Sequence, residues 1–350
     1  MPGCPTAVAA GGRADGLTKD GWAGPAIEVE GLTKRYGGLA AVDGIYFQVA
    51  RAEIFGFLGP NGAGKSTTIR MLATLTPPSA GRARLAGFDV VRQPVEVRRR
   101  IGLVFQDNSL DDRLTAEENL YFHALVYDVP REVYRARADA LLEMVGLRDR
   151  RHAVVRTFSG GMRRRLEIAR GLLHHPTVLF LDEPTVGLDP QTRHAIWEHV
   201  RRLRDETGVT VFLTTHYMEE AEHCDRIAVI DHGRIVALGT PDELRRQVGG
   251  DVVEVGPAGD PDALAEAVAA RYGVEVQRQG ELLVFEVTDG AAFLPRLAQD
   301  FAGHLRSVAT RRPTLEDVFL RLTGHEIRAE EASELDRMRQ RARLWSGARR

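Results

Sequence analysis

Apolar residues recur along this chain in short uninterrupted runs that alternate with longer stretches of helical spacing. Residues 54–58 form one such run, and a glycine-rich segment and a helix from about Ser66 to Pro77 are expected after it. Another helix is expected over residues 193–206. This alternation of strand and helix predicts a parallel sheet covered by helices. The expected strands lie at residues 54–58, 101–105, 177–181, 209–214 and 226–230.

Two other regions carry different patterns. Residues 27–49 alternate apolar and polar side chains and are broken by glycines, which predicts short antiparallel strands in a small β layer. Residues 107–176 turn helical: Thr115 and Glu118 fit a capping box, and residues 131–145 repeat at helical spacing. We therefore expect a helical insertion between two parts of the parallel sheet.

The composition changes after Pro241, and short strands and helices are interleaved there. This pattern predicts a small α+β accessory domain. Strands are expected at residues 251–255, 274–277 and 282–287, and helices at residues 261–272, 291–302 and 314–322.

The chain therefore divides into four expected parts. Residues 1–25 are rich in glycine, alanine and proline without any period, which predicts a disordered tail. An α/β unit spans residues 26–245 and includes the helical subdomain at about 107–176. The accessory domain follows at residues 246–325, where it can regulate, dimerise or stabilise. Residues 326–350 alternate acids and arginines, as in a solvated helix or a frayed tail.

Composition excludes several classes of protein. A net charge of -2 gives no basic field, so nucleic-acid binding has no compositional support. Two cysteines, Cys4 and Cys224, cannot build a disulfide framework, which favours a reduced, cytosolic location. No run approaches the roughly 18 apolar residues of a membrane span, and the N-terminus lacks the apolar core of a signal peptide. We expect a chain that neither crosses a membrane nor is secreted.

The glycine-rich segment between the first expected strand and helix of the sheet matches the phosphate loop in full. Its glycines let the backbone wrap closely, so that amide N–H groups and the helix N-terminus point at phosphate oxygens. Lys65 would place its charge on the β and γ phosphates, and the Ser66 hydroxyl would bind Mg²⁺. The residues expected to hold the nucleotide are Gly59, Pro60, Asn61, Gly62, Ala63, Gly64, Lys65, Ser66 and Thr67.

Two acids follow the apolar run that ends at Leu181. Asp182, at the end of a buried strand beside the loop, can hold Mg²⁺ or its waters. Glu183 can orient or deprotonate the attacking water. An isolated Asp-Glu pair would mean little, but four apolar residues precede this one and Pro184 follows it. With the phosphate loop, the pair predicts hydrolysis of a nucleotide.

Three single residues are candidates because of their positions. His216 follows the expected strand at 209–214, so it should emerge at the carboxyl end of the sheet and can donate to a γ phosphate. Gln106 ends the expected strand at 101–105 and is a candidate contact for Mg²⁺ or the lytic water. Tyr36 precedes the first glycine turn and can stack on adenine, with core packing as the alternative.

A second glycine turn, Phe158-Ser159-Gly160-Gly161-Met162, opens a basic helical segment. Ser159 can donate through its hydroxyl, and the amides of Gly160 and Gly161 at a helix start can bind an anion. Because the phosphate loop already surrounds one side of the nucleotide, we expect this turn to close over a γ phosphate held by a second protomer. We therefore expect a two-fold dimer whose protomers are held together by ATP and separate after ATP hydrolysis.

Together these motifs resemble the nucleotide-binding subunit of ATP-binding cassette (ABC) transporters over about residues 26–245. The resemblance implies a P-loop NTPase core of the RecA-like type, with an N-terminal antiparallel β layer and a helical insertion. The matching segments are Tyr36, residues 59–67, Gln106, residues 158–162, 181–183 and 187–189, and His216.

The same resemblance implies roles for individual residues. Tyr36 would stack on adenine, and Gln106 would couple the site to a membrane partner. Asp189 would communicate across the dimer, and His216 would sense the γ phosphate. Ser159 and Gly161 would bind the opposite ATP. Phe158 and Met162 depart from the usual Leu and Gln of the motif, which leaves Ser159 and its glycines in place.

Residues 313–320 resemble the C-terminal element of the daunorubicin-resistance-type subfamily of drug-export ATPases. This resemblance implies an exporter whose membrane permease is a separate chain. We therefore expect a cytoplasmic ATPase, peripheral on the inner face of the cell membrane, that forms a homodimer and energises export of a hydrophobic drug or antibiotic.

Two alternatives use the same phosphate loop. A soluble cassette ATPase acting on nucleic acid or ribosomes would usually carry coiled coils, zinc modules or two cassettes, and none is visible in the sequence. A phosphoryl-transfer kinase would have no use for the turn at residues 159–161.

Overall fold

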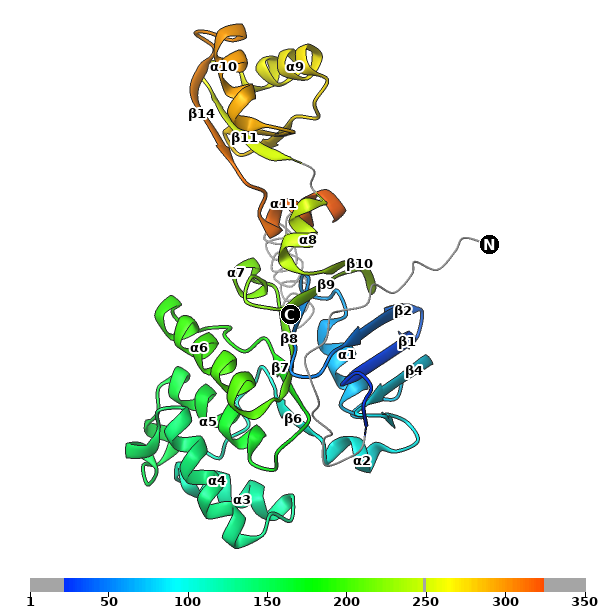
Figure 1. The fold of residues 1–350 in the computed structure, drawn as a ribbon, viewed down its shortest axis with the longest axis vertical. Coiled ribbons are helices and arrows are strands. Elements are labelled where there is room, and N and C mark those ends of the chain that lie inside the picture. The colour runs from blue at the N-terminus through cyan, green and yellow to red at the C-terminus, as the bar shows by residue number, and fades with distance from the viewer. Residues whose placement is uncertain (1–21, 248–249, 324–350) are drawn as a thin grey trace, which may run out of the picture.

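The computed structural model describes residues 22–247 and 250–323, and Figure 1 shows their elements. An α/β part with a helical extension makes up the lower half of this view, and a smaller α+β unit stands above it. The expected disordered segment 1–25 lies largely outside the described residues, and the charged segment 326–350 lies entirely outside them. Both expectations stay predictions.

A six-stranded sheet forms the centre of the α/β part, in the order β10-β9-β3-β8-β7-β6. Neighbours from β9 to β6 are parallel, and β10 adds an antiparallel edge. Every residue of β3, β7 and β8 is buried, as expected for parallel strands covered on both faces. The parallel sheet predicted from the apolar runs is confirmed. Its strands are β3 (Ile54–Leu58), β6 (Ile101–Val104), β7 (Val178–Asp182), β8 (Thr210–Thr215), β9 (Arg226–Asp231) and β10 (Arg234–Gly239).

Alternate side chains of β7 point into two different cores. Leu179 and Leu181 belong to a core shared with α5 and α6, whereas Val178 and Phe180 belong to one shared with α1. Helices α1 and α5 therefore cover opposite faces of the sheet (Figure 1). These helices are α1 (Lys65–Leu72), α5 (Gly160–Leu172) and α6 (Pro190–Thr207). Helix α1 ends before the expected Pro77, and Thr74 just beyond it adopts a left-handed φ of 63°.

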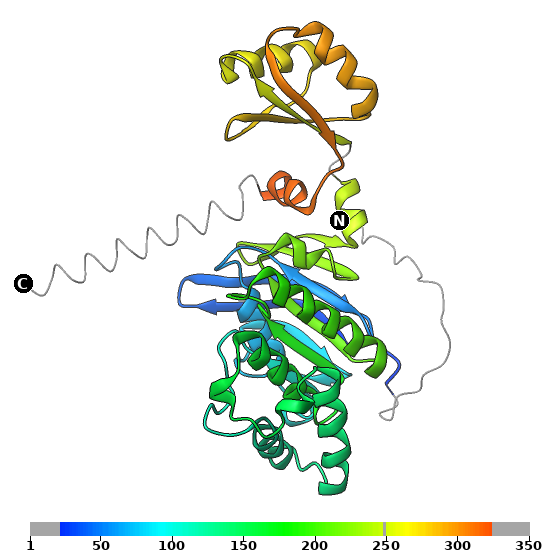
Figure 2. The same cartoon turned by 90° about the vertical axis from the view of Figure 1, so that its left-hand side faces the viewer.

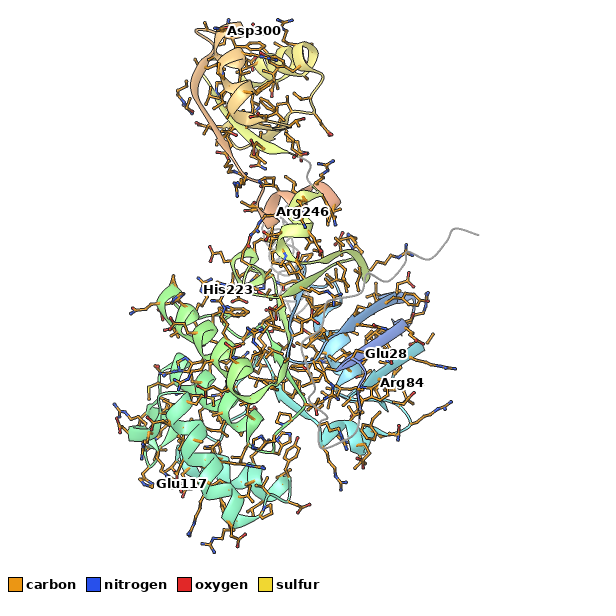
Figure 3. The ribbon with its side chains drawn as sticks, in the orientation of Figure 1. Glu28, Arg84, Glu117, His223, Arg246 and Asp300 are labelled. Carbon is orange, nitrogen blue, oxygen red and sulfur yellow. The ribbon has the colours of Figure 1, made fainter. Side chains whose placement is uncertain are left out.

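An antiparallel layer of order β2-β1-β4-β5 shares the core on the α1 side. The predicted antiparallel β layer is confirmed, but its strands are not short: two strands of 10 and 11 residues, with shifts in register, occupy residues 27–49. Gly31 and Gly44 adopt left-handed φ values of 58° and 65°, so they bend the strands without ending them. Arg84 and Glu28 pair across the layer at 3.9 Å (Figure 3). The elements are β1 (Ile27–Tyr36), β2 (Leu39–Val49), β4 (Ala80–Leu85), β5 (Phe88–Asp89) and the short helix α2 (Pro94–Arg98).

The helical extension precedes α5, as the sequence pattern predicts. Thr115 and Glu118 form the expected capping box: Glu118 N donates to Thr115 Oγ1 over 3.2 Å, and Thr115 N donates to Glu118 Oε2 over 2.7 Å. The elements are α3 (Ala116–Val126), α4 (Arg131–Met144) and the 3₁₀ turns η1 (Arg148–Arg150) and η2 (Val155–Thr157).

The small unit has a four-stranded sheet of order β12-β13-β11-β14 with two helices. The expected strand at residues 274–277 is wrong, since the strand begins only at Gln277. Strand β14 was not predicted, because few of its residues are apolar and pairing with β11 makes it a strand. The elements are β11 (Asp251–Pro257), α9 (Pro261–Tyr272), β12 (Gln277–Gln279), β13 (Leu282–Val287), α10 (Gly290–Asp300) and β14 (Leu305–Arg311).

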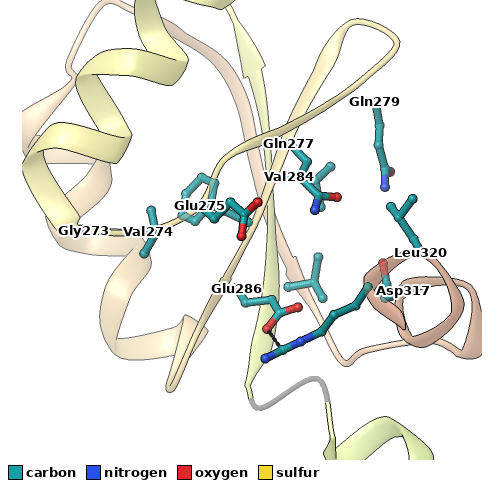
Figure 4. Close-up of a pocket in the computed structure, with 12 residues that line it drawn as sticks. Gly273, Val274, Glu275, Gln277, Gln279, Val284, Glu286, Asp317 and Leu320 are labelled. Atoms are coloured by element: carbon teal, nitrogen blue, oxygen red, sulfur yellow. Dashed lines mark hydrogen bonds and ion pairs between the residues drawn. The ribbon is translucent and has the colours of Figure 1, made fainter. Parts of the chain in front are cut away.

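Two short helices, α8 (Pro241–Arg246) and α11 (Leu315–Thr323), lie between the two parts in both views (Figures 1 and 2). Phe319 of α11 belongs to the same core as Leu179 of the central sheet. A cavity of about 340 Å³ separates the other face of α11 from the small sheet, and Arg321 pairs there with Glu286 (Figure 4). Helix α11 therefore contacts both parts.

Candidate nucleotide site

The phosphate-loop motif forms the turn from β3 into α1, the context that the sequence predicts. Gly62 and Gly64 adopt left-handed φ values of 81° and 109°. Close packing also requires glycine: a Cβ on Gly59 would lie 2.2 Å from Ile230 O, and one on Gly64 would lie 2.5 Å from Ala41 O. These glycines therefore admit the backbones of β9 and β2 as well as shaping the loop.

Lys65 is buried at the first position of α1. Its Nζ donates to the carbonyl oxygens of Gly59 over 2.8 Å and Pro60 over 2.9 Å. The same nitrogen lies 3.3 Å from Glu183 Oε1. The positive charge is thus held at the loop and the helix N-terminus, an arrangement suited to a phosphate group.

Asp182, at the end of β7, accepts hydrogen bonds from two hydroxyl groups. Its Oδ1 accepts hydrogen bonds from Ser66 Oγ over 3.1 Å and from Thr214 Oγ1 over 2.6 Å. Hydroxyl and carboxylate oxygens are ligands that Mg²⁺ prefers, so Ser66 and Asp182 fit the expected metal contact. Sequence reasoning missed Thr214 as an orienting group, although its place near the end of the neighbouring strand was a signal.

Glu183 adopts a left-handed φ of 48°, which residues other than glycine rarely occupy. Its Oε1 lies 3.3 Å from Lys65 Nζ and 3.3 Å from His216 Nδ1. Burial opposes ionisation of the Glu183 carboxyl, but the hydrogen bond with His216 and the charge of Lys65 outweigh it. The pKa of Glu183 therefore lies below its ordinary value. An ionised, buried carboxylate in this position can accept a proton.

The structure places the other predicted residues at the same edge or on the surface. His216 follows β8, before the short helix α7 (Met218–Ala221). Gln106 is exposed just beyond β6, and it lies at the edge where β7 ends because β6 and β7 are paired in parallel. Tyr36 is 48% exposed at the end of β1, which excludes the core-packing alternative.

The Ser-Gly-Gly turn begins a helix on the opposite face of the sheet from α1. Ser159 Oγ accepts from Met162 N over 3.3 Å and caps α5, and Asp189 Oδ1 accepts from Thr192 N over 3.0 Å and caps α6. The two caps are neighbours, because a Cβ on Gly161 would lie 2.4 Å from Thr192 Cγ2. Ser159, Gly160 and Asp189 are exposed, so another molecule can reach them.

Sequence reasoning also missed three buried polar side chains beside the site. Arg164 and Glu167 form an ion pair of 3.2 Å within α5, and their spacing of three residues on one helix was the signal. Glu220 in α7 accepts a hydrogen bond from Thr185 Oγ1, and burial raises the pKa of its carboxyl to about 7.

Comparisons with known proteins identify the family. A family model described as ABC transporter matches residues 42–186, and one described as ATP-binding protein DrrA1-3-like, C-terminal domain, matches residues 239–323. The daunorubicin resistance ATP-binding protein DrrA3 of Streptomyces coeruleorubidus is 47% identical over 314 residues, which cover 88% of this chain and 99% of that protein. This chain belongs to the ATP-binding proteins of ABC transporters.

Two further relatives of this ABC ATPase agree. The Nod factor export ATP-binding protein I of Ralstonia nicotianae is 46% identical over 310 residues, covering 87% of this chain and 95% of that protein. A solved structure, the dimeric post-hydrolysis state of the ATP-binding cassette MJ0796 bound to ADP and Pi, superposes with a TM-score of 0.56. It is 27% identical and covers 61% of this chain and 98% of that chain.

The predicted family, fold class and ATPase activity are confirmed for this ABC ATPase, and nucleotide binding follows from its ABC domain. None of these relatives supports the alternative of an ATPase acting on nucleic acid or ribosomes. Among the described helices, none combines the length and apolar character that a membrane span needs.

Proposed function

We propose that this ABC ATPase hydrolyses ATP to drive export of a hydrophobic drug or antibiotic through a separate membrane permease. The observation that carries the catalytic part is the buried contact of Glu183 with both Lys65 and His216. Two relatives support the transport part by their names, one a daunorubicin resistance protein and the other a Nod factor export protein.

The contacts of the site support a role for each group. Lys65 and the loop amides bind the β and γ phosphates, while Ser66 and Asp182 hold Mg²⁺, which neutralises phosphate charge when bound. Glu183 accepts the proton of the attacking water, because its carboxyl is kept ionised. His216 orients Glu183 and donates a hydrogen bond to the γ phosphate. Gln106 contacts Mg²⁺ or the attacking water from the end of β6.

The exposed residues of the site support a homodimer with two composite sites. Tyr36 offers an accessible ring for adenine at the edge of the β layer. Ser159, Gly160 and Gly161 of one protomer close over the ATP of its partner, and Asp189 contacts that partner beside them. The dimeric state of the related MJ0796 cassette supports this arrangement.

An apolar face of α3 supports a permease as the membrane partner. Tyr121, Phe122, Leu125 and Val126 are exposed on this helix, in the segment that follows Gln106. Exposed apolar residues gathered on one helix are typical of a protein interface. We propose that a cytoplasmic apolar segment of the permease docks there, which holds the ATPase at the inner face of the cell membrane.

The catalytic proposal is tested with Glu183→Gln in the full-length chain, with and without its permease. This variant should bind ATP, accumulate a closed dimer and lose most hydrolysis, because the amide cannot accept the proton. Glu219→Gln is the matched control, since Glu219 is an exposed acid in the nearby α7. Hydrolysis by Glu183→Gln at the parent rate would remove Glu183 from the mechanism.

The transport proposal is tested by efflux of a fluorescent anthracycline from cells that express the chain with its permease. Cells with the parent chain should accumulate less dye than cells with Glu183→Gln. The proposal would be contradicted if cells with the parent chain and cells with Glu183→Gln accumulated equal amounts of the anthracycline, and equal amounts of other apolar antibiotics. This would hold even if ATP hydrolysis were intact.

A further inference from the structure

Arg164 joins three segments of the site through one buried side chain, of which 7% is exposed. Its Nε donates to Pro184 O over 2.7 Å, and its Nη2 donates to Asp182 O over 3.1 Å. Its Nη1 donates to Phe105 O. Two of these carbonyl groups belong to the residues immediately before and after Glu183.

Glu183 needs such support because of its backbone conformation. A left-handed φ, here 48°, is unfavourable for a residue with a Cβ. Such a conformation persists only where the surroundings hold it in place. Arg164 donates hydrogen bonds to the carbonyl groups of the residues before and after Glu183. In addition, Glu183 N donates to Thr214 Oγ1 over 3.1 Å. The direction of the Glu183 carboxylate toward Lys65 and His216 follows from this backbone.

The partner of Arg164 extends the network to the segment that contains Gln106. Arg164 Nη1 lies 3.2 Å from Glu167 Oε2. Glu167 Oε1 accepts from Ser109 N over 2.7 Å and from Ser109 Oγ over 3.1 Å. Residues 105–109 are therefore held at both ends by one ion pair on α5, the helix that Ser159 caps.

We propose that Arg164 is a positioning residue for ATP hydrolysis, which holds the backbone of Glu183 in its left-handed conformation and ties it to residues 105–109. A guanidinium suits this role because its N–H donors point in fixed directions within one plane. A lysine carries its three N–H donors on a single nitrogen, so it cannot reproduce the separate directions from which Nε, Nη1 and Nη2 donate. The inference rests on the proposed role of Glu183 as proton acceptor.

The test compares Arg164→Lys with Arg165→Lys in the full-length chain. Arg165 is a matched control on the same helix, since its Nη1 donates to Val145 O over 2.8 Å in the helical extension. Arg164→Lys should lower kcat at least about tenfold, while ATP affinity stays within about threefold and the melting temperature changes little. Arg165→Lys should keep the parent kcat. A kcat of Arg164→Lys near the parent value would overturn the inference, and so would a parallel loss of ATP affinity and melting temperature.

A second variant, Glu167→Gln, decides the question if Arg164→Lys does not fold. It keeps the guanidinium but removes the carboxylate that orients it, so kcat should fall with unchanged ATP affinity. Glu183→Gln distinguishes a failure of the proposed role of Glu183 from a failure of the proposed role of Arg164. If Glu183→Gln hydrolyses ATP normally, the proposed role of Glu183 fails. If it is inactive while Arg164→Lys and Glu167→Gln are fully active, only the role of Arg164 fails.

Discussion

Ser66 Oγ donates to Asp182 Oδ1 over 3.1 Å and joins residues 116 positions apart at the carboxyl edge of the central sheet. Thr214 donates to the same oxygen over 2.6 Å. One carboxylate oxygen thus links α1, β7 and β8, three elements that are distant in sequence. The two hydroxyl groups fix the direction of the Asp182 carboxylate, which we propose binds Mg²⁺.

Thr214→Val tests this orientation because it keeps the side-chain shape and removes the hydroxyl. The variant leaves Asp182 Oδ1 without one donor and removes one acceptor of Glu183 N, so the free energy of unfolding should fall by about 1–3 kcal/mol. The Mg²⁺ concentration for half-maximal ATP hydrolysis should rise, which a titration of the rate with Mg²⁺ measures. Thr210→Val is the control at the other end of β8, where Thr210 Oγ1 accepts from Ala52 N over 3.0 Å. An unchanged Mg²⁺ requirement in Thr214→Val would contradict the orienting role.

Gly161→Ala should disturb the junction between the caps of α5 and α6. The new Cβ would lie 2.4 Å from Thr192 Cγ2, and Thr192 Oγ1 is held by Asp189 Oδ2 over 2.6 Å. We expect a loss of about 1–3 kcal/mol in the free energy of unfolding and weaker ATP-dependent dimerisation. Adding Thr192→Ser removes the clashing methyl group and keeps both hydrogen bonds to Asp189. Urea unfolding and light scattering measure both effects, and failure of the double variant to recover would rule out this clash as the cause.

Two half-buried histidines should make the protein less stable in acid. His174 Nε2 lies 2.9 Å from Ile101 O, and His123 Nε2 lies 3.4 Å from His174 Nδ1. Burial is the main cause that lowers the pKa of His123 from 6.5 to about 3 and that of His174 to about 4. Between these values and pH 6.5 the unfolded chain binds more protons than the folded one, so stability falls as the pH drops.

Urea unfolding at several pH values checks this expectation. From pH 6.5 to 5 the loss should reach about 1.5 kcal/mol for each histidine. His123→Leu removes one titrating group and should reduce the loss by about half. The exposed His194 provides the control variant, His194→Gln. An identical pH dependence in His123→Leu and the parent would show that this pair does not control acid stability.

Phe319→Ala should destabilise the α/β part even though α11 follows the small sheet in sequence. Phe319 is 1% exposed within the core that contains Leu179, so its truncation should cost about 3–5 kcal/mol. Leu320 faces the cavity on the other side of α11, and Leu320→Ala should cost only about 1 kcal/mol (Figure 4). Thermal unfolding of both variants measures the difference. Equal effects would mean that α11 does not contribute selectively to the larger core.

The sequence predicts much of the fold where local pattern and final environment agree. The apolar run at Ile54–Leu58 is a buried strand, and Thr115 with Glu118 forms the capping box expected from its spacing. Strand β14 could not be predicted, because its residues are mostly polar and its conformation depends on pairing with β11. The strand expected near Val274 fails for the related reason that alternation alone does not supply a partner.

The sequence by itself determined which groups can perform the chemistry, since the loop that contains Lys65, the acids Asp182 and Glu183, and the turn at Ser159 are contiguous motifs. Only the tertiary structure decided how these groups are held. The contacts of Arg164 and Thr214 join segments that are far apart in the chain, and no local pattern encodes them. The left-handed backbone of Glu183 is likewise a product of packing, because its own side chain disfavours that conformation and its neighbours impose it.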